Sequence, residues 1–337
     1  MSAGVSVIVP CYNEERTIGL LLEAIRDQTF SVDRVEVIIA DGMSTDGTRG
    51  AIQAFQRAHA SPKVLLVDNP ARDIPSALNQ ALRHAAGDVV IRLDAHSVPR
   101  SDYIERCLAA LERTGAANVG GVWEIEPSST RWIARGIAAA ASHPIGAGDA
   151  RYRTQGKQGE VDTVPFGAFQ RSWIERVGPF DETLLSNEDY EYNYRLRKAG
   201  GTIWFDPEIR SVYYARETLG ALGRQYFRYG LWKARMLARH PESLRWRQAL
   251  PAGFFLGLVV LSFGSLFIRP VRWLLALYLG GYCLVTLAAG AQQAVRKRDW
   301  SLMFGFPLSL WVMHLAWGAG FFWAILSSIG GEPGGRG

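Results

Sequence analysis

The chain has 337 residues, enough for one large domain with an appendage, and its formal net charge at pH 7 is +5. Thirteen Lys/Arg and three Asp/Glu follow Thr218, a balance of +10 that leaves −5 on the first 218 residues. An acidic first domain without a basic stripe argues against nucleic acid as a partner, whereas basic residues beside apolar segments suit anionic lipid head groups. Cys11, Cys107 and Cys283 have no metal-ligand spacing and require no disulfide.

The beginning of the chain lacks the pattern of an export signal. The first apolar run, Val5–Pro10, is too short for the hydrophobic region of a signal peptide and follows no basic segment. We therefore expect the N-terminal domain to remain in the cytoplasm.

Apolar runs of strand length alternate with helically spaced segments up to Asp94. The spacing predicts strands at Ser6–Val9, Val35–Ala40, Val64–Val67 and Asp88–Leu93, and helices at Thr17–Asp27, 49–60 and Ile74–Ala86. Such alternation is typical of an α/β domain with a mostly parallel sheet.

Three polar, turn-rich loops follow these strands, at Pro10–Glu14, Asp41–Thr48 and Asp94–His96. In open α/β sheets, ligands bind beyond the carboxyl ends of the strands, so the loops predict a binding site at one sheet edge. Taken singly, the first loop is also consistent with a plain strand exit and the second with a helix cap.

Asp94 and His96 are the first candidates for chemistry. They lie two residues apart after a strand, where a carboxylate and an imidazole can share a divalent ion. Such an ion would neutralise a diphosphate leaving group. A triplet of this kind is more often structural, and its place at a strand end is what favours the functional interpretation.

Asn187, Glu188 and Asp189 open a predicted helix near Ser186–Ala199. The helix dipole favours carboxylates in a first turn, which is a sufficient structural reason for both acids. The functional interpretation is a general base that takes a proton from an attacking hydroxyl. Spacing alone favours the structural explanation.

Two further segments have the composition of helices that lie against a membrane or another protein. Residues 131–147 combine Trp132 with many alanines, and residues 219–240 interleave arginines with aromatic side chains, as in an interfacial helix. In the second segment, Gln225 and Arg228 are three residues apart and share a helix face. Arg228 can bind a phosphate through two hydrogen bonds or meet lipid head groups, and the sequence leaves both open.

Three charge-free segments near the C-terminus are long enough to cross a membrane: Ala249–Ile268, Trp273–Ala294 and Ser301–Ile329. About 20 helical residues cross a hydrocarbon core of about 30 Å. Buried core helices are the alternative, but such helices usually show a polar face. By the positive-inside rule, the basic run 296–298 between the second and third segments indicates that this loop and the N-terminal domain share the cytoplasmic side. Arg269 and Arg272, between the first and second segments, weaken the rule. Exposed apolar spans also allow a homodimer.

Taken together, these motifs resemble those of the family 2 glycosyltransferases, which have the GT-A fold. Residues 7–15 look like the family's first strand and donor loop, and residues 41–48 are similar to its second donor loop. The resemblance implies that the nucleoside is held by Pro10, Tyr12, Glu14 and Asp41, with Asp41 reaching the base.

Asp94 and His96 stand where the family usually has Asp-X-Asp. The resemblance implies that both residues meet a metal ion and the diphosphate. Because Mg²⁺ prefers oxygen ligands and imidazole suits Mn²⁺ better, the histidine predicts that Mn²⁺ is preferred over Mg²⁺.

Two motifs later in the chain follow in the same order as in the family. Residues 187–190 match its Glu-Asp motif, which implies that Asp189 is the catalytic base and that Glu188 supports it. Residues 225–229 resemble its Gln-X-X-Arg-Trp motif, with tyrosine in place of tryptophan. This match implies phosphate binding by Gln225, Arg228 and Tyr229.

Within the family, the chain is most similar to the succinoglycan-type exopolysaccharide transferases, through segments 92–96, 162–168, 187–200 and 225–230. This similarity implies an inverting transfer of a hexose, from a donor expected to be UDP-linked, to a saccharide on polyprenyl diphosphate at the cytoplasmic membrane face. The alternatives are a polyprenyl-phosphate monosaccharide synthase, a processive polysaccharide synthase and a non-catalytic membrane scaffold.

We therefore expect four segments along the chain. They are a GT-A glycosyltransferase domain at 1–218, amphipathic interfacial helices at 219–248, three transmembrane helices at 249–329 and a flexible tail at 330–337.

Overall fold

The computed structural model of the chain describes residues 4–329. It divides into two compact units: Met1–Glu124 with Arg151–Tyr213, and Ile125–Ala150 with Tyr214–Gly337. The tail expected at 330–337 lies outside the described residues.

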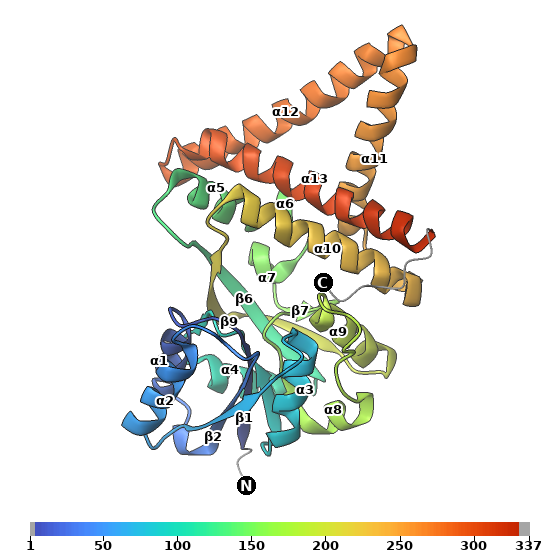
Figure 1. Cartoon of the computed structure of the whole chain (residues 1–337). Coiled ribbons are helices and arrows are strands. Elements are labelled where there is room, and N and C mark those ends of the chain that lie inside the picture. Colours follow the sequence, from blue (N-terminus) through green and yellow to red (C-terminus); the bar gives the residue numbers. More distant parts are fainter. Residues whose placement is uncertain (1–3, 330–337) are drawn as a thin grey trace. The chain divides into compact units, whose positions relative to one another are not determined.

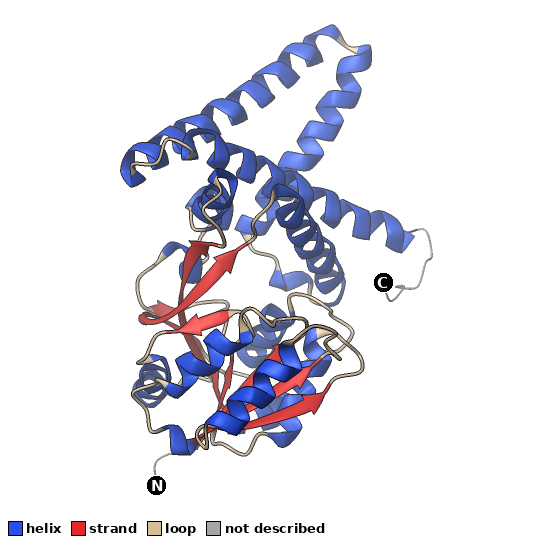
Figure 2. Cartoon of the chain, turned by 60° about the vertical axis from the view of Figure 1, so that its left-hand side comes forward, coloured by secondary structure: helices blue, strands red, loops and turns tan. Residues whose placement is uncertain are grey.

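The first unit is built around one nine-stranded sheet, with helices lying against it (Figures 1 and 2). The strands are β1 (Val5–Cys11), β2 (Val35–Asp41), β3 (Lys63–Asp68), β4 (Val89–Arg92), β5 (Ser97–Pro99), β6 (Asn118–Pro127), β7 (Gly159–Glu160), β8 (Ala168–Gln170) and β9 (Ile203–Ala215). Their order is β3-β2-β1-β4-β8-β6-β9-β5, and β7 pairs with β9. β3, β2, β1 and β4 run parallel, whereas β8 is antiparallel to both β4 and β6, and β9 to both β5 and β7.

The helices of this unit are α1 (Ile18–Arg26), α2 (Thr48–Ala58), α3 (Ile74–His84), α4 (Tyr103–Thr114), α7 (Arg151–Thr154), α8 (Arg171–Val177) and α9 (Glu188–Lys198), with a 3₁₀ turn at Val32–Arg34. The central strands are apolar and buried along most of their length, as expected where both faces of a sheet are covered. Ile8, Ile38, Leu78, Val90 and Phe205 belong to the core that forms there.

The strands and helices predicted between Ser6 and Asp94 are confirmed by the structure. The parallel part of the sheet is limited to four strands, and antiparallel strands extend it to a mixed sheet. Hydrophobic periodicity identifies a strand but not the direction of its neighbour, because both kinds of ladder bury the same alternating side chains.

The second unit is helical. Its helices are α5 (Trp132–Ala141), α6 (Pro144–Ala147), α10 (Leu219–Arg239), α11 (Trp246–Phe267), α12 (Arg269–Lys297) and α13 (Leu302–Ile329), with a 3₁₀ turn at Pro241–Ser243. Thr218 caps α10, since its hydroxyl oxygen accepts a hydrogen bond from the Ala221 amide at 3.2 Å. The core is formed by α5, α10 and α13, with Ile137, Tyr226, Phe306 and Leu310 buried in it.

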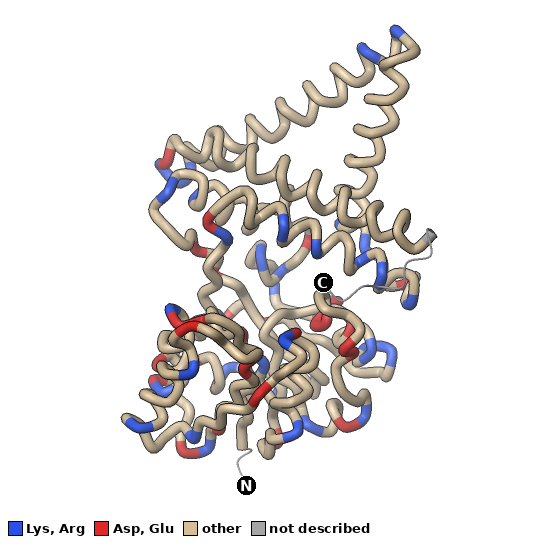
Figure 3. The backbone as a smooth tube through the Cα atoms, viewed as in Figure 1, with Lys and Arg blue, Asp and Glu red and all other residues tan. Residues whose placement is uncertain are grey.

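Three of the described helices are long and apolar enough to cross a membrane: α11, α12 and α13, with mean hydropathies of 2.0, 1.8 and 1.4 over their most apolar windows. The three apolar helices predicted near the C-terminus are therefore confirmed as candidate spans. In Figure 3, Lys and Arg gather near the ends of these helices and along α10, and leave long uncharged stretches between.

Candidate active site

The carboxyl ends of the parallel strands lie at one edge of the sheet. The register pairs Cys11 with Asp41, and Asp41 with Asp68. β4 is parallel to β1 as well, so the chain leaves the sheet on the same side after Arg92. The loops after β1, β2 and β4 thus meet at one edge, as the sequence predicts.

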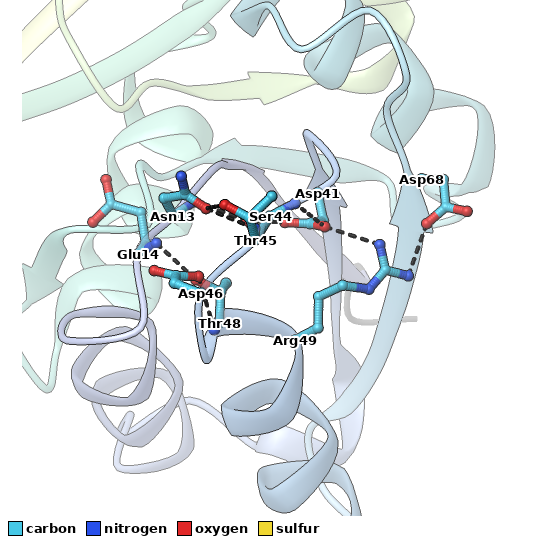
Figure 4. Close-up of polar contacts among 9 residues, drawn as sticks. All are labelled: Asn13, Glu14, Asp41, Ser44, Thr45, Asp46, Thr48, Arg49 and Asp68. Carbon is cyan, nitrogen blue, oxygen red and sulfur yellow. Dashed lines mark hydrogen bonds and ion pairs between the residues drawn. The ribbon is translucent and has the colours of Figure 1, made fainter.

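Asp41 is fully buried at the end of β2 and lies in a polar network (Figure 4). One carboxylate oxygen accepts from the Ser44 hydroxyl, and the other accepts from the Ser44 amide at 3.0 Å and from Arg49 Nη1 at 2.9 Å. Arg49 Nη2 lies 2.8 Å from Asp68 Oδ1. Direct contact between Asp41 and a nucleobase would require these partners to move, whereas the Arg49 side chain is 34% exposed.

Hydrogen bonds join the first two loops into one structure (Figure 4). The Asn13 amide donates to Ser44 Oγ at 2.8 Å, and Asn13 Oδ1 accepts from the Thr45 amide at 2.9 Å. The Glu14 amide donates to Thr48 Oγ1 at 2.7 Å. Backbone amides of each loop thus donate to side-chain oxygens of the other, and these bonds hold the two loops together.

The side chains of the first loop point in different directions. Pro10 is partly buried in β1, whereas Tyr12 is 45% exposed and offers a ring face for stacking. Glu14 faces the third loop, with its Oε1 2.9 Å from His96 Nδ1. Thr17 Oγ1 donates to Glu14 Oε2 at 2.5 Å, so the carboxylate that orients His96 is itself held in place.

A cation at Asp94 and His96 would have to share its coordination with a substrate. Among residues 4–329, no group of three or more His, Cys, Asp and Glu could hold a metal ion by itself. Mg²⁺ and related ions are commonly held by one or two protein ligands together with substrate phosphates. With Nδ1 turned toward Glu14, Nε2 of His96 is the ring atom that would face a cation, and a carboxylate behind a ligating histidine is a common arrangement.

Arg92 connects the third loop to α9. It is buried at the last position of β4, and its Nη2 lies 2.7 Å from Glu188 Oε1 and 3.2 Å from Asp94 Oδ1. Its Nε and Nη1 have no hydrogen-bond partner among the described residues. Burial lowers the pKa of the guanidinium, but the carboxylates of Asp94 and Glu188 outweigh burial and hold that pKa above its ordinary value. Arg92 therefore stays charged between the two acids.

Asp189 lies beside Glu188 in the first turn of α9. Its Oδ1 accepts a hydrogen bond from the Tyr190 amide at 2.7 Å. Burial, and then the charge of Glu188, raise the pKa of Asp189 to about 6, against the opposing charge of Arg92. A carboxylate with a pKa near the working pH is well suited to general base catalysis.

In the second unit, the predicted phosphate motif lies on α10. Gln225 Nε2 donates to the Tyr229 hydroxyl at 2.9 Å, one helical turn away. The rings of Tyr226 and Tyr229 meet edge to face at 5.5 Å, and Arg228 is exposed. These contacts fix the position of Tyr229 on α10.

Two arginines that organise the strand ends, Arg92 and Arg49, belong to none of the site roles expected from the sequence. Arg92 follows Val89, Val90 and Ile91 in a buried strand, and a charge in such a run requires partners elsewhere in the fold. A charged residue at the end of an apolar strand is therefore the sequence feature that indicates a buried ion pair at Arg92. Arg49 lies on the first turn of α2 and had no comparable signal.

The chain is similar in sequence to known proteins of one family. Residues 6–178 match the family model described as Glycosyl transferase family 2. The chain is 35% identical over 326 residues to the succinoglycan biosynthesis protein ExoA of Rhizobium meliloti (strain 1021), across 95% of this chain and 94% of that protein. It is 27% identical over 329 residues to a dolichyl N-acetyl-alpha-D-glucosaminyl phosphate 3-beta-D-2,3-diacetamido-2,3-dideoxy-beta-D-glucuronosyltransferase of Methanococcus voltae, across 96% and 97%.

Solved structures share the fold at lower sequence identity. The mannosyltransferase PcManGT from Pyrobaculum calidifontis, in complex with GDP-Man and Mn²⁺, superposes with a TM-score of 0.59 at 22% identity, over 94% of this chain and 88% of that one. TarS of S. aureus in complex with UDP-GlcNAc gives a TM-score of 0.52 at 15% identity, over 91% and 90%. At these identities the likeness establishes a common fold.

Proposed function

Since this chain belongs to glycosyl transferase family 2, we propose that it transfers a hexose from a UDP-linked donor to a saccharide carried on polyprenyl diphosphate. The transfer would take place at the cytoplasmic face of the cytoplasmic membrane, in exopolysaccharide or cell-surface glycan synthesis. One observation carries the proposal: Arg92 contacts both Asp94, on the proposed diphosphate side, and Glu188, beside the proposed base. Residues of two separate motifs thereby form one contact group.

The proposed reaction is a single in-line displacement at the anomeric carbon of the donor sugar. Asp189 takes the proton of the acceptor hydroxyl, whose oxygen forms the new bond to the anomeric carbon. The bond from that carbon to the diphosphate oxygen breaks, and its electron pair leaves with the nucleoside diphosphate. Attack from the face opposite the leaving group inverts the configuration, and the contact between Arg92 and Glu188 keeps the base in position.

Asp94 and His96 would hold a divalent cation together with the donor diphosphate, and Glu14 would orient His96. When bound, the cation supplies positive charge that stabilises the leaving diphosphate. The solved mannosyltransferase complex contains Mn²⁺, which supports a divalent cation here. We propose a preference for Mn²⁺ over Mg²⁺, because imidazole is a better ligand for Mn²⁺.

The acceptor assignment is supported by the apolar helices and by the relatives. A lipid-linked saccharide stays in the bilayer, so an enzyme with three candidate spans would work where that substrate is held. The Methanococcus voltae relative is named as a transferase of a dolichyl-linked sugar phosphate. The Rhizobium meliloti relative is named as a succinoglycan biosynthesis protein. Gln225, Arg228 and Tyr229 would bind a phosphate of the carrier.

The test is a panel of nucleotide sugars offered to the purified full-length protein, with released nucleoside diphosphate as the measured product. The acceptor is a polyprenyl-diphosphate saccharide, polyprenyl phosphate or none. We expect release to rise with one UDP-sugar and only with the diphosphate-linked saccharide. Equal release with polyprenyl phosphate would instead indicate a monosaccharyl-lipid synthase.

The base assignment has its own control in this assay. Asp189→Asn keeps the size of the side chain but cannot accept the proton, so transfer should fall by about 10²-fold or more. The matched variant Asp27→Asn, at a surface carboxylate that is 63% exposed, should leave transfer unchanged. If Asp189→Asn transfers sugar as well as the parent does, another group is the base.

A further inference from the structure

The backbones of α10 and α13 are in direct contact within the second unit. A Cβ at Gly230 would lie 1.9 Å from the carbonyl oxygen of Trp317, and a Cβ at Gly320 would lie 2.0 Å from the carbonyl oxygen of Phe227. Only glycine allows so close an approach, and it occurs on both helices. The two helices therefore pack directly against each other, with no side chain between their backbones at these points.

The opposite face of α10 is a stripe of arginines. At about 100° per residue, Arg224, Arg228, Arg235 and Arg239 fall within an arc of about 60°. The buried residues Leu222, Tyr226 and Met236 lie on the other side, toward the core. Four guanidinium groups on one helix do not enter hydrocarbon, so this face of α10 points away from the acyl chains.

α13 is covered along one side by other helices of the second unit. Phe306, Leu310, Met313 and Trp317 follow one another at spacings of four, three and four residues, and all are buried. Over its most apolar window, 39% of α13 is buried, against 6% for α11 and 11% for α12.

α5 covers the beginning of α13. A Cβ at Gly136 would lie 2.4 Å from the backbone of Gly305, so these two helices also touch through glycines. α5 has ten residues, about 15 Å of helix, which is half of a hydrocarbon core. Arg135, on α5, forms a 2.8 Å ion pair with Asp299 just before α13. An ion pair thus holds this end of α13.

α13 also contacts the bases of the other two apolar helices on its far side. Gly318 approaches Phe255 of α11, and Gly290 of α12 approaches Pro307. Within this unit, α11 and α12 diverge from α13 toward a shared tip at Ile268, while α13 runs beside α10 (Figures 1 and 3). From the arginine stripe inward, the second unit therefore has three successive layers: α10 with α5, then α13, then the α11–α12 hairpin.

We propose that α13 lies in the plane of the membrane interface, beside α10, and that the α11–α12 hairpin is the part of the described chain that crosses the bilayer. The apolar surface of α13 then rests on the acyl chains, and the arginine stripe of α10 meets anionic head groups. Ser328, at the far end of α13, accordingly lies on the same side of the membrane as the first unit, which joins α10 through Thr218. A transmembrane α13 would place Ser328 on the opposite side.

Labelling of single cysteines with a membrane-impermeant maleimide tests this topology in the full-length protein. Cys11 and Cys107 are buried, so replacing the exposed Cys283 by serine gives a background that should remain unlabelled. Three reporters are introduced into it: Glu112→Cys on the first unit, Ile268→Cys at the hairpin tip and Ser328→Cys. All three positions are exposed. Intact spheroplasts and inverted membrane vesicles present opposite faces to the reagent.

We expect Ser328→Cys and Glu112→Cys to react in the same preparation, and Ile268→Cys to react in the other. If Ser328→Cys reacts together with Ile268→Cys, α13 crosses the membrane and the proposal is wrong. Reaction of Ser328→Cys only after detergent is added would place it in hydrocarbon, which also overturns the proposal. Because the readout does not depend on sugar transfer, it is independent of the proposed function.

Discussion

Arg92 and Glu188 form a buried ion pair, with Nη2 of the arginine 2.7 Å from Oε1 of the glutamate and both side chains 6% exposed. The same nitrogen lies 3.2 Å from Asp94 Oδ1. One guanidinium thus joins the end of β4 to the beginning of α9. The unpartnered Nε and Nη1 of Arg92, among the residues described, leave this charge dependent on the two acids.

Removing Arg92 should therefore cost much stability. Arg92→Leu leaves the buried carboxylate of Glu188 without its partner, and breaking a buried pair in this way typically costs about 3–5 kcal/mol. Thermal and denaturant unfolding of the purified protein measure the loss. The matched control is Arg106→Leu, because Arg106 forms an ion pair with Asp102 in which the two side chains are 41% and 36% exposed. We expect that control to cost about 1 kcal/mol or less. Equal losses in the two variants would contradict the role given to burial.

The pH dependence of transfer should report the pKa of Asp189, which burial and Glu188 raise to about 6. A base must be deprotonated, so kcat/KM should rise with pH through about 6 and then level off. Glu188→Gln removes the neighbouring negative charge and should shift this limb to lower pH. Glu175→Gln, at an exposed carboxylate on α8, is the control and should leave the limb in place. A limb that stays fixed or moves upward in Glu188→Gln would show that another group titrates.

The metal preference should follow the identity of residue 96. Chelation by EDTA should abolish transfer, and Mn²⁺ should restore it better than Mg²⁺, because an imidazole is one of the proposed ligands. His96→Asp supplies an oxygen ligand and should move the preference toward Mg²⁺. The measurement is initial rate against the concentration of each ion. Full activity with Mg²⁺ and no gain from Mn²⁺ in the parent would refute the preference.

Arg49 should matter for the nucleotide more than for the chemical step. Arg49→Ala removes the cation that lies 2.9 Å from buried Asp41 and 2.8 Å from Asp68. We expect weaker binding of the nucleoside diphosphate, by about tenfold, with a smaller change in kcat. Isothermal titration with the nucleoside diphosphate gives the affinity. Arg57→Ala, at an exposed position on the same helix, should bind as the parent does.

Arg228 should act on the acceptor and not on the donor. Arg228→Ala should lose transfer to the lipid-linked saccharide, while nucleotide binding and slow donor hydrolysis partly survive. Arg224→Ala, one turn earlier on the same arginine stripe, separates this role from general attraction to the membrane. Similar losses in both variants would indicate head-group binding alone, and loss of nucleotide binding in Arg228→Ala would place the residue on the donor.

The sequence by itself determined the features that depend on short-range pattern. Apolar runs and helical spacing predicted the elements from Ser6 to Asp94, because a strand or helix buries a periodic set of neighbours in the chain. Charge-free length predicted three helices able to cross a membrane, since length and composition are sufficient for that property.

Only the tertiary structure decided which side chains meet. Arg92 and Glu188 are 96 positions apart, and nothing in the local pattern around either residue indicates its partner. Asp41 was predicted to reach a base, and only the fold shows its carboxylate enclosed by Ser44 and Arg49. Likewise, hydropathy makes α13 a candidate span, but the glycine contacts with α10 depend on how two helices pack. Local sequence sets periodicity and charge, whereas contacts between distant segments are set by the packing of the whole chain.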